Sequence, residues 1–339
     1  MSPVRHVRRP PTSPRRAVQG VTLVELMVAL VLGLIVAGSA MAVFISNRQT
    51  YVATASMGRL QEGARIAFEL MSRDVRGAGT IPCSNETLLN NIVDTADWWA
   101  AKGAGASSTE QWKNTSFFGY STADGDALQL ISAASPEAAP TVVASEPASG
   151  LPMDLAVNSV DGISAGDLLM VCDYGYFDST TGAKRSPEGA IFQATAVATG
   201  KITIAETGTP GNSTPDPTLF VPDAPLMPQA NGLVAMVRPV RWYIGDNTHG
   251  GKSLFRTRLV NDAGTLSLAE DEIVPGAEDM DLSYLVEDAT SYVPAASVAD
   301  WTKVLAVQVD LHLTGTDTVD GVAIERHLQH VIAVRNRNL

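Results

Sequence analysis

A single carboxylate interrupts an apolar stretch near the N-terminus. Glu25 is the only charged residue between Val21 and Ile45. An ionised glutamate in membrane hydrocarbon costs several kcal/mol, so such a residue is interpreted as functional unless its side chain snorkels to the interface. The chemistry open to Glu25 is an ion pair, because a buried carboxylate is tolerated when an opposite charge lies within a few ångströms.

The residues around Glu25 allow three interpretations of the N-terminus. A secretory signal could be cleaved at a small-residue motif such as Ala40-Met41-Ala42, but Glu25 would interrupt its apolar region. A twin-arginine signal could begin at Arg8-Arg9 or Arg15-Arg16, although the residues after each pair do not continue that motif. In the third interpretation the chain is cut after Gly20, which leaves the apolar helix on the mature protein with a free ammonium group at its start. Only this third interpretation gives both Gly20 and Glu25 a role.

The elements that position these residues begin with a basic leader. Residues 1–20 contain five arginines and no acidic residue. The positive-inside rule predicts that this end stays in the cytoplasm and that the bulk of the chain lies outside the inner membrane. Residues 21–45 are long enough to cross a bilayer as one helix.

We expect this helix to continue past the membrane and to cover residues 21–79. Proline is absent from 46–78, and Gly77 and Gly79 followed by Pro82 indicate where the helix ends. Apolar residues recur along one helical face at three- and four-residue spacing. They are Met57, Leu60, Ala64, Ala67 and Met71. Beyond about Met57 this face is expected to pack against the protein's own head domain.

After Pro82 the apolar pattern changes to strict alternation, which indicates half-buried strands. The clearest cases are 280–286 and 305–313. Shorter candidates are Asp126–Ser132, Asp167–Asp173, Ala190–Ala198, Lys201–Ala205, Arg241–Ile244, Ser253–Val260 and Leu328–Arg335. One long helix followed by many strands predicts an α+β fold with an antiparallel β-sheet head over residues 80–339.

Two further features concern the head. Residues 207–232 hold six prolines, too many for regular structure, and predict an exposed loop. Cys83 and Cys172 are the only cysteines. An even pair on the outer side of a membrane can form a disulfide, and two separate buried thiols are the alternative.

The charge of the mature chain argues against nucleic acid as a partner of the head. The whole chain has a net charge of −12, and removing the five leader arginines leaves 19 basic and 36 acidic residues, a net charge of −17. Proteins that bind nucleic acid present a basic surface, and no strong basic patch is evident in this sequence.

Several motifs that suggest catalysis or metal binding fail on inspection. Gly250-Gly251-Lys252-Ser253 resembles part of a phosphate loop, but position 246 is Asp rather than Gly, and a hairpin turn is favoured. His327 and His330 on one strand would point to opposite faces. Asp124-Gly125-Asp126 lacks the spacing of a known calcium loop and is interpreted as a turn. We therefore predict no catalytic residue, no metal and no cofactor.

The segment Gly20-Val21-Thr22-Leu23-Val24-Glu25-Leu26 resembles the processing site of type IV prepilins and type II secretion pseudopilins. The resemblance implies that a membrane prepilin peptidase cuts after Gly20 and methylates the new amine of Val21. It also implies that Glu25, the fifth mature residue, pairs with the N-terminal amine of a neighbouring subunit and registers the helices in a filament. The family usually has Phe at the first mature position, where this chain has Val21.

Five blocks of the chain resemble the minor pilins of the PilW type. They are Asn47–Tyr51, Leu60–Arg65, Arg73–Gly79, Val274–Met280 and Ala333–Arg337. This resemblance implies a non-enzymatic subunit that helps to prime and assemble type IV pili at or near the tip. It would support twitching motility, adhesion or DNA uptake. Its expected partners are other minor pilins, the major pilin, the prepilin peptidase and the inner-membrane assembly platform.

Three alternatives remain at this point. The chain could be a type II secretion pseudopilin, since the processing motif is shared by both systems. It could be a membrane-anchored or secreted enzyme with an apolar N-terminus, which would be indifferent to loss of Glu25. It could also be an adhesin whose head, with the Pro-rich loop, carries specificity for a surface.

Overall fold

The computed structural model describes most of the chain and divides it into two compact units, Met1–Thr54 and Ala55–Leu339. The described residues are 20–79, 88–90, 99, 103, 115–134, 141–145, 151–173, 188–208, 211–212, 232–319 and 321–334. The predicted loop 207–232 lies largely outside this set. So does Cys83, and only the backbone is described at Cys172, so the predicted disulfide remains a prediction.

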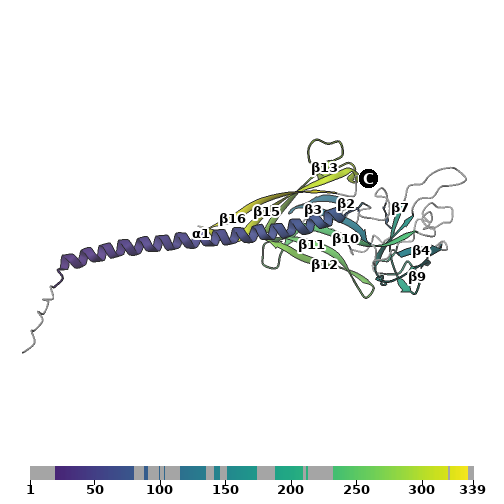
Figure 1. The fold of residues 1–339 in the computed structure, drawn as a ribbon, viewed down its shortest axis with the longest axis horizontal. Coiled ribbons are helices and arrows are strands. Elements are labelled where there is room, and N and C mark those ends of the chain that lie inside the picture. Colours follow the sequence, from purple (N-terminus) through teal and green to yellow (C-terminus); the bar gives the residue numbers. More distant parts are fainter. Residues whose placement is uncertain are drawn as a thin grey trace, which may run out of the picture. The chain divides into compact units, whose positions relative to one another are not determined.

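The first element is one long helix, α1, which spans Leu23–Gly77 (Figure 1). No proline interrupts this stretch, so no interior N–H is missing from the helical ladder. The helix ends where Gly79 adopts a φ of 73°, a conformation that favours glycine. The N–H of Gly79 then donates to the carbonyl of Ile131 at 3.1 Å, which attaches the end of the helix to the sheet.

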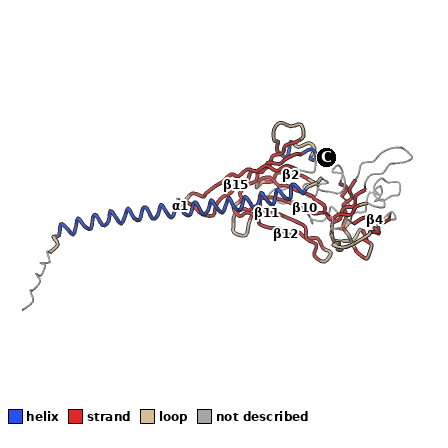
Figure 2. Tube along the Cα trace, in the orientation of Figure 1, coloured by secondary structure: helices blue, strands red, loops and turns tan. Residues whose placement is uncertain are grey.

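Strands make up nearly all the remaining regular structure that is described (Figure 2). They are β1 (Leu88–Asn90), β2 (Phe117–Thr122), β3 (Gly125–Ala134), β4 (Thr141–Ser145), β5 (Met153–Val157), β6 (Leu168–Asp173), β7 (Glu188–Gln193), β8 (Ala196–Ala198), β9 (Lys201–Ile204), β10 (Leu233–Asp246), β11 (Lys252–Asp262), β12 (Thr265–Pro275), β13 (Ala277–Val286), β14 (Val293–Pro294), β15 (Val304–Val319) and β16 (Val322–Ala333). Short 3-10 turns, η3 (Ala295–Ser297) and η4 (Trp301–Lys303), precede β15.

The described strands form two sheets, and their pairing is antiparallel except between β1 and β7. The larger sheet is organised around β10, which pairs with β3 on one side and with β6 and then β11 on the other. The smaller sheet has the order β14-β13-β15-β16. The main chain of Leu282 in β13 donates to Asp126 of β3 at 2.9 Å and so joins the two sheets. This architecture confirms the predicted α+β fold with a long N-terminal helix and an antiparallel head.

Both sheets pack against the second part of α1. The face of α1 that carries Leu60, Ala64, Ala67, Met71 and Val75 is buried in one core with residues from β10, β13 and β15. These include Trp242, Met280 and Leu311, whose side chains are inaccessible to solvent. The apolar stripe beyond Met57 therefore packs as the sequence predicted. Small residues allow a close approach, since a Cβ at Gly63 would lie 3.3 Å from Val274 of β12.

One buried carboxylate locks the helix onto the larger sheet. Arg256 on β11 donates to both oxygens of Asp74, at 2.7 and 3.1 Å, and the indole of Trp242 on β10 donates at 3.1 Å. Trp242 and Arg256 are cross-strand partners, so the β10–β11 register aims both donors at one point. The Asp74 side chain is only 8% exposed and that of Arg256 15%. Fork-shaped pairing of this kind fixes geometry as well as contributing energy.

The strands found in the structure differ from the predicted ones where burial departs from alternation. Around Arg241–Ile244 the sequence predicts four strand residues, whereas β10 has 14 because it is central and buried on both faces. The predicted strand 190–198 is two strands, β7 and β8. The pairing of β7 with β6 ends at Gln193, and the N–H of Thr195 donates instead to the carbonyl of Thr203 in β9. β12 was not predicted, because it is an edge strand with charged residues in its middle.

We expect Asp74→Asn to destabilise the fold by about 3 kcal/mol, because it leaves the largely buried guanidinium of Arg256 without a counter-charge. Urea unfolding of the full chain in detergent micelles measures this. As a matched control, Glu69→Gln on the exposed face of the same helix should change stability by less than about 0.5 kcal/mol. Equal effects of the two variants would show that the ion pair does not hold the helix.

Candidate functional site

The N-terminal site lies at the start of α1. Gly20, Val21 and Thr22 precede the helix, which begins at Leu23. The hydroxyl of Thr22 accepts the backbone N–H of Glu25 at 3.2 Å. Thr22 is thus the N-cap, and Glu25 lies at the third helical position, where a carboxylate is favoured by the helix dipole.

The Thr22-x-x-Glu25 spacing is that of a capping box ahead of an apolar run. The N-cap at Thr22 was not predicted from the sequence, although this signal lies within the segment Gly20–Leu26. It predicts that the helix starts after Thr22 rather than at Val21. It also places the Gly20–Val21 bond ahead of the first helical turn.

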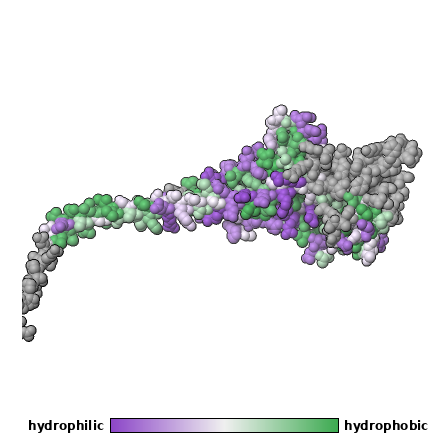
Figure 3. Space-filling view, viewed as in Figure 1, coloured by the Kyte–Doolittle hydropathy of each residue, from purple (hydrophilic) through white to green (hydrophobic). Residues whose placement is uncertain are grey.

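The first part of α1 exposes a continuous apolar surface. Large side chains from Val21 to Ile45 are between about half and three quarters exposed. Figure 3 shows this surface over the first part of α1. The helix contains a stretch long and apolar enough to cross a membrane, and no residue of that stretch is buried. A surface of this kind needs a lipid or protein environment.

The carboxylate of Glu25 has no side-chain partner among the residues that the structure describes. Glu25 is exposed, in the first turn of the helix, and surrounded by apolar neighbours. Because an unpaired charge is costly in an apolar environment, a cation supplied from elsewhere would stabilise it. The arrangement can therefore form an intermolecular ion pair.

The motifs that sequence analysis set aside have structural roles. Asn247 and Gly251 close a turn between β10 and β11, with the N–H of Asn247 donating to the carbonyl of Gly251 at 2.7 Å, which confirms the hairpin predicted for 250–253. Asp124 lies in the turn between β2 and β3 and pairs with Lys252 at 2.8 Å. Asp126 accepts hydrogen bonds from Ser121 and Leu282, so both of its oxygens serve the fold.

The histidines of β16 lie on opposite faces of the sheet, as their spacing predicted. His327 stacks on its cross-strand partner His312, with ring centroids 4.1 Å apart. His330 instead faces α1, where it contacts Phe68 and lies 3.4 Å from the hydroxyl of Ser72. Among the residues that the structure describes, no three His, Cys, Asp or Glu side chains are arranged to hold a metal ion.

A long apolar N-terminal helix followed by an antiparallel head is a pilin-like α+β fold. Two family comparisons identify the type. Residues 15–41 match the prokaryotic N-terminal methylation motif, and residues 241–334 match type IV pilus-assembly protein W. The chain therefore matches a PilW-type pilin. No curated protein and no solved structure matches it.

One match covers the start of α1, and the other covers strands that pack against its second part. The first includes Gly20, Val21, Thr22 and Glu25. The second runs from β10 to the residue after β16 and so includes most of the strands that pack against α1. A type IV pilus-assembly protein is a structural component of the pilus rather than a known enzyme, and its role implies contacts with other pilus components.

We expect Thr22→Ala to weaken the start of α1 by about 1 kcal/mol, the usual contribution of an N-cap side chain. Amide hydrogen exchange of residues 23–26 in detergent micelles should then be severalfold faster than in the native chain. Thr50→Ala is the control, because its hydroxyl bonds to the carbonyl of Ser46 within the same helix and caps nothing. Unchanged exchange in Thr22→Ala would contradict the capping role.

Proposed function

We propose that this protein is a minor pilin subunit that helps to prime and assemble type IV pili, at or near the pilus tip. The carboxylate of Glu25 supports this proposal most directly. It is exposed in the first turn of an apolar helix and has no side-chain partner among the described residues. A filament of such helices would supply the missing cation as the N-terminal ammonium of a neighbouring subunit.

In this proposal the chain is made as a precursor with a cytoplasmic leader, residues 1–20. The prepilin peptidase cuts after Gly20 and methylates Val21, and residues 21–45 hold the subunit in the inner membrane with its head outside. The assembly platform then extracts it into the pilus, where it contacts other minor pilins and the major pilin. Gly20 and Val21 are exposed and precede α1, so the bond between them lies outside the helix, which supports the cut.

The mature N-terminus gives the first test. Mass spectrometry of the protein from cells that carry the pilus machinery should show a chain that begins with methylated Val21. A mature chain that begins near Met41 or Val43 would indicate a secretory signal and would contradict the proposal. Deletion of the prepilin peptidase should leave the leader attached.

Glu25→Ala should be cleaved and inserted in the membrane normally, yet be lost from pili. Loss of a buried ion pair worth about 3 kcal/mol corresponds to a reduction of incorporation by roughly a hundredfold. Immunoblots of sheared pili and of membranes measure both quantities. The control is Glu62→Ala, an exposed glutamate on the same helix within the head.

Deletion of the gene separates the priming role from a passive one. The proposal expects few or no surface pili in the deletion strain and recovery with the native gene but not with the Glu25→Ala variant. Normal piliation in the deletion strain would contradict priming. Loss of protein secretion with normal pili would instead identify a type II secretion pseudopilin.

A further inference from the structure

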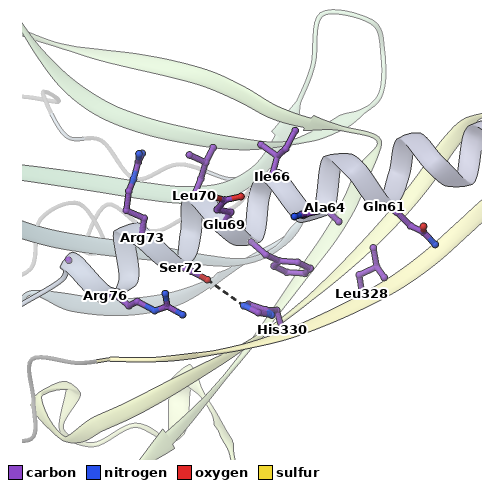
Figure 4. A pocket seen from close by; sticks show the side chains of 13 residues that line it. Gln61, Ala64, Ile66, Glu69, Leu70, Ser72, Arg73, Arg76, Leu328 and His330 are labelled. Atoms are coloured by element: carbon purple, nitrogen blue, oxygen red, sulfur yellow. Dashed lines mark hydrogen bonds between the residues drawn. The ribbon is translucent and has the colours of Figure 1, made fainter.

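A groove lies along α1 beside the edge strand β16. It has a volume of about 1140 Å³ and extends over both flanks of α1. Figure 4 shows Leu70, Ile66 and Arg73 on one flank, and Ser72 and Arg76 on the other with His330 of β16. The second flank, between α1 and β16, is the part considered below.

Strand β16 runs beside α1 from Met57 to Ser72. The guanidinium of Arg326 donates to the sulfur of Met57 at 3.1 Å, and His330 lies 3.4 Å from Ser72. The cross-strand partners of β16 on β15, such as Leu311 opposite Leu328, are completely buried, whereas Leu328 and His330 are only half-buried. The side chains of β15 that face α1 are therefore fully covered, whereas those of β16 remain partly exposed to solvent.

The outer edge of β16 has no partner strand among the described residues. It is 12 residues long, whereas natural edge strands are usually short or blocked. An extended segment placed on this edge would continue the small sheet around α1. Its inward side chains would then cover the flank of the helix that the sheet leaves open.

The open flank of α1 combines apolar and cationic side chains. Gln61, Arg65, Phe68, Ser72 and Arg76 recur at three- and four-residue spacing and so share one helical face. Phe68 contributes an apolar surface that His330 covers in part. Arg65 and Arg326 have no carboxylate partner among the described residues.

The charge of this groove is opposite to that of the protein. The face of α1 that carries Gln61, Arg65, Phe68, Ser72 and Arg76 holds two arginines and no acidic residue, whereas the chain after the leader has a net charge of −17. A partner that combines apolar side chains with carboxylates would thus match both the apolar floor and the cationic wall.

We propose that this groove binds an extended segment of a neighbouring pilus subunit by strand addition to β16. Alternate side chains of the segment face α1, with apolar ones on Phe68 and Leu328 and acidic ones beside Arg65 and Arg326. The source of the segment rests on the proposed function, whereas the chemistry of the groove does not.

A synthetic peptide tests the groove by itself. The probe peptide is about ten residues long, a usual strand length. It has threonine at every second position and either valine or glutamate at the positions between. A second peptide has lysine in place of each glutamate. Fluorescence anisotropy with the full chain in detergent micelles should show the glutamate peptide binding at least about tenfold more tightly. Amides of residues 322–333 should become protected from hydrogen exchange.

Charge reversal on α1 supplies a matched pair of variants. Arg65→Glu should invert the preference between the two peptides. Arg73→Glu, an exposed arginine on the other flank of the same helix, should leave it unchanged (Figure 4). Equal binding of the two peptides, equal effects of the two variants, or no protection along β16 would each overturn the proposal.

The source of the segment is tested in cells. A photo-crosslinking amino acid at Gln61, at the groove, should join a segment of another pilus subunit that mass spectrometry maps outside its N-terminal helix. The control site is Glu62, the next residue, which is exposed and outside the groove lining. Adducts with a subunit's N-terminal helix, with lipid or with a second copy of this chain would overturn this assignment, even where the peptide result holds.

Discussion

The second part of α1 is held by one buried carboxylate and a face of small and apolar side chains. Asp74 receives three hydrogen bonds from Arg256 and Trp242, which lie opposite each other on β11 and β10. The ion pair fixes the rotation and position of the helix, and burial of residues such as Ala67 and Met71 supplies the apolar contact. Because the rotation of the helix is fixed, the side chains that face β16 and line the groove are fixed as well.

The first part of the same helix is not packed against the head. It exposes apolar side chains on all sides and carries one carboxylate, whereas the second part is amphipathic and docked. An apolar surface of this kind is suited to lipid and, under the proposed function, also to the interior of a filament. Under the proposed function, a cation from a neighbouring subunit would stabilise the carboxylate of Glu25, so this charge would select a correctly placed neighbour.

An element of this fold could be predicted from the sequence when residues close together in the chain carry its pattern. The end of α1 near Gly77 and the strands β13 and β15 follow from short patterns, and the structure has them close to the expected positions. β5 alternates buried residues at Met153, Leu155 and Val157, so its pattern was present but overlooked. β10 and β12 depart from alternation, because one is buried on both faces and the other is an acidic edge strand.

The sequence by itself determined the processing motif, the long helix with its apolar first part, and the alternating strands of the head. Each of these depends on residues a few positions apart, so the chain displays it directly. Only the tertiary structure decided that Asp74 meets Arg256, 182 residues away, and that β16 leaves one flank of α1 open beside Arg65. Such contacts depend on strand order and register, which bring distant residues together without leaving a pattern in the nearby sequence.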